Sequence, residues 1–287
     1  MKIGRIDHLA STLSHEYHVY QRTAGSLGIS PVRWYGKEGY HEVIVLDNLG
    51  ASLSELISAQ QFDNRKTFHI AAQMVRLFLN MQDFTELFPQ LSIIESLHSR
   101  HYIHCDIKPA NFMTRVGDSG DPSVFLIDLG LARLFRDPAT YLHIPYSMDH
   151  LTIGTLPFMS INCQQGRAQS RRDDLESLTY TIICLARGNL PWAGLSNPEA
   201  VLQKKLSCTA EELCEDLPAP FCKFINHVRA LAFDEKPAYQ YLHSILVELQ
   251  RSHTKSDQSG NAIHSCTPTA RQSSIKLEST PAFSNQM

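Results

Sequence analysis

The chain has 287 residues and a formal net charge of −3 at pH 7, which is enough length for a sizeable core or for two lobes around one cleft. The near balance of charge gives no general attraction to nucleic acid or to anionic membranes, and no apolar run reaches the roughly 18 residues of a membrane span. The seven cysteines form no Cys-x-x-Cys motif and the 14 histidines lack metal-site spacing, so we expect reduced thiols, no zinc site and a cytoplasmic or nuclear location.

Residues 1–49 predict one helix followed by a β-hairpin. The start of the chain lacks the apolar run of a secretory signal. Large side chains then recur at helical spacing, at Leu9, Leu13, Tyr17 and Tyr20. Turn residues 25–31 end this helix, and the β-rich runs 32–35 and 43–47, joined by residues 36–39, predict the hairpin.

The rest of the chain is mostly helical by its apolar spacing and ends in a polar tail. The predicted helices cover residues 53–57, 67–78, 93–99, 174–187, 221–232 and 239–250. From about residue 252 the chain is rich in Ser, Thr, Gln and Asn, so burial cannot offset the loss of chain entropy. We therefore predict one domain over residues 1–250 and a disordered Ser/Thr-rich tail over residues 251–287.

The most informative motif is HCDIKPAN at residues 104–111, followed by DLG at residues 128–130 after an apolar run. Transfer of a phosphoryl group needs a carboxylate for the hydroxyl proton, an ammonium near the moving group, and oxygen ligands for magnesium. The candidates for these roles are Asp106, Lys108, Asn111 and Asp128. Their order along the chain is that of the catalytic loop and the metal-binding loop of protein kinases.

Further motifs narrow this resemblance. Residues 160–162 are Ser-Ile-Asn, where most kinases have Ala-Pro-Glu. With the motifs at residues 154–155, 170–177, 190–192 and 233–239, the chain resembles the casein kinase 1 family of serine/threonine kinases over about residues 1–250. The resemblance implies an α+β, bilobal protein-kinase-like fold, with a reduced N-terminal β lobe over residues 1–49 and a large helical C-terminal lobe over residues 50–250.

The resemblance also implies a reaction, the transfer of the γ-phosphoryl group of ATP to Ser or Thr hydroxyls of protein substrates. Asp106 would act as base or orient the hydroxyl, Lys108 would steady the charge, and Asn111 and Asp128 would hold Mg²⁺. Asp174 would brace the backbone of the catalytic loop. Arg229 would be a structural partner in the helical lobe.

The same resemblance assigns the nucleotide contacts. Leu46 would lie at the back of the adenine pocket, and Asp47, Asn48 and Leu49 would form the hinge that binds the base. The other implied contacts are Ser52 and Glu55 beside the ribose, and Met113 and Ile127 on the pocket floor. For each apolar member, ordinary core packing is the alternative.

The N-terminus departs from the family pattern. A kinase of this type opens with two strands joined by a Gly-x-Gly-x-x-Gly loop, whereas this sequence begins at the strand that follows them. Lys2 and Glu16 occupy the places of the phosphate-binding lysine and its glutamate partner, although a lysine beside the initiator methionine is also typical of a solvated terminus. We therefore expect reduced activity, and a pseudokinase or binding scaffold is the alternative function.

Three substitutions bear on regulation and substrate choice. Cys105 replaces an arginine that pairs with an activation-segment phosphate in many kinases, so we expect no activating phosphate to act through this position. Leu129 replaces phenylalanine and leaves Asp128 able to bind metal. Pro157 replaces an arginine thought to bind a phosphate already on the substrate. A basic face for acidic peptides, or merely a solvated basic face, would comprise Arg171, Arg172, Lys204 and Lys205.

Residues 75–90 form an insertion relative to the family pattern. Its 16 residues would need 48 nucleotides, and its ends can be encoded by splice-like sequences, so a retained short intron is one explanation. A real loop between two helices is the other. The sequence gives no indication of the oligomeric state.

Overall fold

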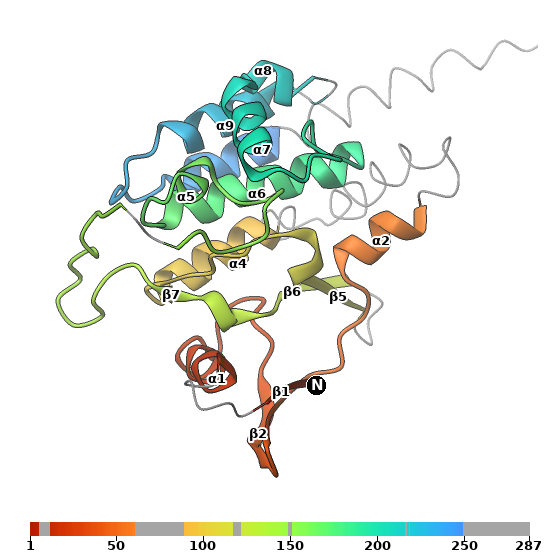
Figure 1. Cartoon of the computed structure of the whole chain (residues 1–287), viewed down its shortest axis with the longest axis vertical. Coiled ribbons are helices and arrows are strands. Elements are labelled where there is room, and N and C mark those ends of the chain that lie inside the picture. The colour runs from red at the N-terminus through yellow and green to blue at the C-terminus, as the bar shows by residue number, and fades with distance from the viewer. Residues whose placement is uncertain are drawn as a thin grey trace, which may run out of the picture.

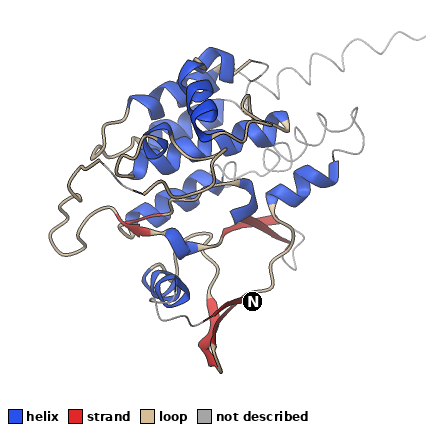
Figure 2. Ribbon diagram, in the orientation of Figure 1, coloured by secondary structure: helices blue, strands red, loops and turns tan. Residues whose placement is uncertain are grey.

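The structure is a computed structural model that describes residues 1–5, 12–60, 89–116, 122–148, 151–215, 217 and 219–248. A small sheet and a helix lie at the N-terminal end, most of the helices gather at the other end, and short paired strands lie between them (Figures 1 and 2). This mixture of helices and small sheets fits the predicted α+β class.

The N-terminal sheet has three antiparallel strands in the order β1-β3-β2. The strands are β1 (Lys2–Arg5), β2 (Val32–Glu38) and β3 (His41–Leu46). The pairing of β2 with β3 confirms the predicted hairpin. Lys2 lies opposite Ile44, so β3 fixes the position of the first strand.

Helix α1 (Thr12–Arg22) packs against this sheet and faces the centre of the molecule. Tyr17 stacks on Tyr35 with 4.0 Å between the ring centroids. Leu13 and Tyr20 are buried, as their helical spacing predicts, while Leu9 lies outside the described residues.

Two small two-stranded sheets and two 3-10 turns lie between the N-terminal sheet and the helices. They comprise β4 (Tyr102–Ile103), η1 (Pro109–Asn111), β5 (Phe112–Val116), β6 (Pro122–Leu126), η2 (Leu129–Leu131) and β7 (Arg133–Leu134). β4 pairs with β7, and β5 pairs with β6. The predicted catalytic loop therefore runs between β4 and β5, and the predicted metal-binding loop runs between β6 and β7.

The remaining helices surround one hydrophobic core. They are α2 (Leu53–Gln60), α4 (Pro89–Ser99), α5 (Ile161–Gln164), α6 (Arg171–Arg187), α7 (Pro198–Ser207), α8 (Ala210–Leu213), α9 (Pro220–Ala230) and a last helix over residues 239–248. A capping box formed by Ser170 and Asp173 begins α6, and Gly188 ends it with a φ of 79°.

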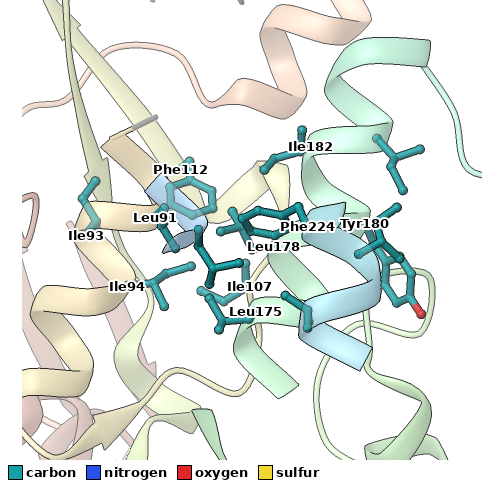
Figure 3. Packing of buried hydrophobic residues seen from close by; sticks show 14 of the residues in the cluster. Leu91, Ile93, Ile94, Ile107, Phe112, Leu175, Leu178, Tyr180, Ile182 and Phe224 are labelled. Atoms are coloured by element: carbon teal, nitrogen blue, oxygen red, sulfur yellow. The ribbon is translucent and has the colours of Figure 1, made fainter. Parts of the chain in front are cut away.

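The core brings the catalytic loop and the helices together. Ile107 and Phe112 pack with Ile94 of α4 and with Leu175 and Leu178 of α6 (Figure 3). All of these side chains are at most 1% exposed. Burial of such side chains stabilises the fold by about 1.5–3 kcal/mol each, so the catalytic loop is anchored by the main core.

Several predictions from the sequence fall on residues that the structure does not describe. These are the helix over residues 67–78, most of the insertion over residues 75–90, and the tail over residues 251–287. Pro89 and Gln90, the last two residues assigned to the insertion, begin α4, and Gln90 is buried. Within the described part of the chain, no helix is both long and apolar enough to cross a membrane.

Candidate active site

Asp174 holds the backbone of the catalytic loop, as predicted. Its two carboxylate oxygens accept hydrogen bonds from the amide nitrogens of His104 at 2.7 Å and Cys105 at 3.0 Å. His98 adds a bond at 2.9 Å through Nε2. Burial opposes ionisation of this carboxyl group, but the bonds from His98 and the loop outweigh burial and hold the pKa of Asp174 below its usual value.

The hydrogen bonds to Asp174 hold Cys105 in a backbone conformation that is unfavourable for a non-glycine residue. Cys105 has a φ of 69°, in the left-handed region that non-glycine residues rarely adopt. The preceding residue, His104, is fully buried, and its Nε2 lies 3.1 Å from the carbonyl of Ile127. The loop is thus held by α6 on one side and by the end of β6 on the other.

Asp106 and Lys108 form a closed polar triangle with Thr155. Lys108 Nζ donates to Asp106 Oδ2 and to Thr155 Oγ1, each at 2.7 Å. Thr155 Oγ1 donates to Asp106 Oδ1, also at 2.7 Å. The sequence analysis did not assign a role to Thr155, and the Gly-Thr motif at residues 154–155 is the signal that points to it.

Gly154 lets this triangle form. Its φ is 112°, and a Cβ atom there would lie 2.8 Å from the carbonyl oxygen of Cys105. Only glycine therefore fits this close approach of two backbone segments. The glycine brings Thr155 within hydrogen-bond distance of the catalytic loop.

Asn111 is hydrogen-bonded to Asp106, and Asp128 is held by Tyr20. Asn111 Nδ2 donates to the backbone oxygen of Asp106 at 2.8 Å, which leaves its Oδ1 atom directed away from that bond. The amide of Asp128 donates to the hydroxyl of Tyr20 at 3.2 Å, and Asp128 itself has a φ of 65°. Burial raises the pKa of the Tyr20 hydroxyl, so this group stays protonated.

Lys2 forms the predicted pair with Glu16 and also contacts Asp128. Its Nζ lies 2.7 Å from Glu16 Oε2 and 2.6 Å from Asp128 Oδ1. Burial favours the neutral amine, but bonds from Asp128 and Glu16 outweigh burial and raise the pKa of Lys2. Burial also raises the pKa of Glu16. For Asp128, burial would raise the pKa, but the bond from Lys2 outweighs burial and lowers it. The Lys2 side chain is thus ion-paired while 45% exposed, and its contact with phosphate stays a prediction.

The predicted nucleotide contacts include four apolar side chains and the charged side chain of Asp47. Leu46, Leu49, Met113 and Ile127 are all partly buried. Asp47 accepts hydrogen bonds from Arg33 Nη2 at 3.1 Å and from Arg115 Nη1 at 3.2 Å. The bond from Arg33 is the main cause of the lowered pKa of Asp47. The side chain of Asp47 is therefore bound to β2 and β5, and its contact with the base stays a prediction.

Ser52 and Glu55 lie together at the start of α2, where each satisfies the other. Glu55 Oε2 accepts from the amide of Ser52 at 2.7 Å, and Ser52 Oγ accepts from the amide of Glu55 at 3.1 Å. This is a capping box, the arrangement expected of Ser-x-x-Glu at a helix start. The structure gives these two side chains a capping role, and their contact with ribose stays a prediction.

Comparison with known proteins shows similarity to protein kinases. Residues 54–186 match the family model described as fungal protein kinase. Over 252 residues the chain is 36% identical to casein kinase I homolog 2 of Schizosaccharomyces pombe, which covers 85% of this chain and 54% of that protein. The chain is similar to the casein kinase 1-like protein kinases over most of its length. It spans about half the length of the curated relative that it matches.

The donor set of this casein kinase 1-like chain fits Mg²⁺. Asn111 and Asp128 offer amide and carboxylate oxygens, the ligands that Mg²⁺ prefers, and it commonly uses one or two such side chains together with substrate phosphates. No cluster of three or more His, Cys, Asp or Glu side chains with metal-site geometry occurs among the described residues. A metal at this centre would therefore be held by Asn111 and Asp128.

The structure corrects the predicted basic face of this casein kinase 1-like chain. Lys205 is fully buried and Arg171 is 7% exposed, so neither belongs to a solvated surface. The Arg171 guanidinium stacks over Phe135, 4.4 Å from the ring centroid, and donates to the carbonyl of Asp234 at 2.7 Å. The prediction failed because side chains of this length can be drawn inward by carbonyl and aromatic partners distant in the sequence.

Arg229 has the structural role that the resemblance implies. Its Nη1 donates to the carbonyl of Cys208 at 2.8 Å, just after α7 ends. This contact ties α9 to the end of α7, because a guanidinium satisfies carbonyl groups that a helix end leaves free.

Proposed function

We propose that the chain transfers the γ-phosphoryl group of ATP to Ser or Thr hydroxyls of protein substrates. The observation that carries this proposal is the triangle of Asp106, Lys108 and Thr155, to which Asn111 is hydrogen-bonded. Similarity to protein kinases supports the same activity. We further propose that residues 1–49 form a reduced N-terminal lobe and residues 50–250 a large helical lobe around this centre.

The geometry supports distinct roles for the two charged side chains of the triangle. Asp106 Oδ2 accepts from Lys108 and, at 3.4 Å, from Asn111, whereas Oδ1 accepts one bond, from Thr155, and retains a lone pair for an incoming hydroxyl. Asp106 would orient that hydroxyl and accept its proton. Lys108 lies 2.7 Å from the same carboxylate, so its ammonium stands where negative charge grows during transfer.

Asn111, Asp128 and Lys2 form the neighbouring part of the site. Bound Mg²⁺ would neutralise phosphate charge during the reaction. Asn111 is held by its own bond to the Asp106 backbone, and Asp128 by its bond to Tyr20. Lys2 pairs with both Glu16 and Asp128 and would bind phosphate oxygens from this position.

Partner and location proposals follow from the sequence. Protein substrates fit the kinase family, and we propose no nucleic-acid or membrane partner and a cytoplasmic or nuclear location. A preference for acidic peptides cannot rest on the predicted basic face, because Arg171 and Lys205 are buried. The pseudokinase alternative is not favoured, because Asp106, Lys108 and Asn111 form their contacts within one site.

A phosphorylation assay with casein, Mg²⁺ and labelled ATP tests the proposal. Asp106→Asn should lower kcat by about 10²- to 10⁴-fold, the range expected when a positioned base is lost. Asp128→Asn should also abolish Mg²⁺-dependent transfer. The matched control is Asp137→Asn, because Asp137 is exposed and its partners are the neighbouring residues Ala139 and Thr140. Equal activity of all three variants would refute the proposal.

A further inference from the structure

Lys205 is a fully buried lysine on α7 whose ammonium has three oxygen partners. Its Nζ donates to the carbonyl of Leu156 at 2.9 Å, to the carbonyl of Met159 at 2.6 Å and to Gln164 Oε1 at 2.8 Å. These bonds use all three N–H groups of the ammonium. No ion pair among the described residues involves Lys205, so backbone and amide oxygens replace the usual carboxylate.

Trp192 binds the same segment of the chain as Lys205. Its Nε1 atom donates to the carbonyl of Pro157 at 2.8 Å, and its ring lies 5.3 Å from Lys205 Nζ. Tyr180 lies at the same distance from Nζ. Lys205 and Trp192 together therefore bind the carbonyls of Leu156, Pro157 and Met159.

The segment 155–159, which we call the anchored turn, also folds back on itself. The carbonyl of Thr155 accepts from the amides of Phe158 at 2.9 Å and Met159 at 3.0 Å. Thr155 is the residue whose hydroxyl contacts Asp106 and Lys108. One peptide unit thus separates the carbonyl held by Lys205 from the residue that completes the catalytic triangle.

We propose that Lys205 is a positioning residue for phosphorylation of protein substrates. It fixes the anchored turn so that Thr155 keeps Asp106 and Lys108 in place, and so that Pro157, which is exposed, stands at a defined position beside them. This inference rests on the proposed kinase activity. Through Lys205, α7 would affect the binding of the protein substrate and not the binding of ATP.

The chemistry of a buried ammonium gives this role a pH dependence. Burial lowers the pKa of Lys205 to about 8, while Glu176 of α6 and Cys163 of α5 act in the opposite direction. Tyr180 of α6 also faces it, and Arg229 of α9 donates to its carbonyl at 3.5 Å. A neutral amine has only two N–H groups for three acceptors, so the anchored turn should loosen as the pH rises through about 8.

Two variants of α7 make the test. Lys205→Met keeps the length of the side chain and removes its three donors, while Lys204→Met removes an exposed lysine from the same helix. For Lys205→Met we expect the KM for a protein substrate to rise about tenfold, the effect of losing bonds to a charged group. The KM for ATP should stay unchanged, which a general loss of structure would not produce. Lys204→Met should match the natural sequence in both.

Hydrogen exchange gives a readout that does not depend on activity. The amides of Phe158 and Met159 should lose about tenfold of their protection in Lys205→Met and none in Lys204→Met. If the natural chain proves inactive, the proposed function fails, and this exchange measurement alone still decides whether Lys205 holds the turn. Unchanged protection would overturn the inference.

Trp192→Phe covers the case in which Lys205→Met does not fold, since it removes one N–H group and keeps an aromatic ring. It should raise the KM for protein substrate in the same direction by a smaller factor. In the natural chain that KM should rise between pH 7 and pH 9, while the KM for ATP follows a separate profile. A KM for protein substrate that is flat over this range and unaffected by Trp192→Phe would overturn the inference.

Discussion

Asp174→Asn should strongly destabilise the protein, although it changes a single atom. The carboxylate accepts two amide hydrogen bonds and one bond from His98 in a site that is 2% exposed. An asparagine has one acceptor oxygen, so its NH₂ group would face an N–H donor. Each hydrogen bond to a charged group contributes about 1.5–3 kcal/mol, and we expect a loss of about 3–5 kcal/mol after partial relaxation.

Asp173 is a matched control, since it is the adjacent residue on the same helix turn and is 4% exposed. Its Oδ1 atom accepts from the hydroxyl of Ser160 at 2.6 Å, and its Oδ2 atom accepts from the amide of Ser170 at 2.8 Å. Burial raises the pKa of Asp173 to about 6, so a neutral side chain suits this site better than it suits Asp174. Asp173→Asn should therefore cost less stability.

The two carboxyl groups should also give opposite pH dependences. The pKa of Asp174 is lowered, so its contribution to stability is present above its ordinary value of 3.8 and is lost as the pH falls through the folded value. The pKa of Asp173 is raised to about 6, so the folded state retains a proton that the unfolded state releases, and stability falls as the pH rises from about 4 to 6.

Urea unfolding at pH 3 to 8 measures both effects. Asp174→Asn should flatten the loss of stability at acid pH, and Asp173→Asn should flatten the loss between pH 4 and 6. The reasoning would be refuted if Asp174→Asn cost less than about 1 kcal/mol at pH 7, the contribution of a single ordinary hydrogen bond. It would also be refuted if both variants gave the same pH profile.

Three further variants test the active site by phosphotransfer kinetics. Lys2→Met removes the ammonium between Glu16 and Asp128 and should lower kcat/KM for ATP by about 10²- to 10³-fold. Lys236→Met, at an exposed position, should leave kcat/KM unchanged. An equal effect of both variants would contradict the role of Lys2. Thr155→Val should lower kcat by about tenfold or more, because Asp106 and Lys108 lose a shared hydroxyl. Thr155→Ser should retain activity, and a serine variant as impaired as valine would argue against the shared hydroxyl. Asp47→Asn should change the KM for ATP by less than about threefold, because its arginine partners are exposed and salt-screened; a larger change that persists in high salt would refute this.

The sequence allowed the candidate residues Asn111 and Asp128 to be placed near each other because short local motifs bracket one hairpin. Asn111 precedes β5 and Asp128 follows β6, so the antiparallel pairing of these two strands brings both residues to the same end. The spacing of Lys2 and Glu16 was equally informative once β3 fixed the first strand. Local pattern and strand pairing agree here, and this is the situation in which sequence reasoning succeeds.

The roles of Lys205 and Thr155 were not predictable in the same way. Lys205 follows another lysine on a helix, a pattern typical of a solvated face, and nothing local shows that the anchored turn lies against it. Its burial depends on carbonyl groups 46 and 49 positions earlier in the chain. Thr155 likewise gains its role from contact with Asp106, 49 positions away. Such positions need the tertiary structure, because no periodicity encodes them.

Tyr239, the last residue of the motif at residues 233–239, contacts the catalytic loop through His98 and Asp174. Its hydroxyl lies 2.5 Å from His98 Nδ1, and His98 Nε2 lies 2.9 Å from Asp174 Oδ2. Because an ionised carboxylate can only accept, Nε2 donates to Asp174, and the hydroxyl fixes the orientation of the ring. The last described helix therefore reaches the catalytic loop through His98 and Asp174. Any change that moves that helix should act on the Cys105 backbone, and so on the position of Asp106, before it acts on the nucleotide side.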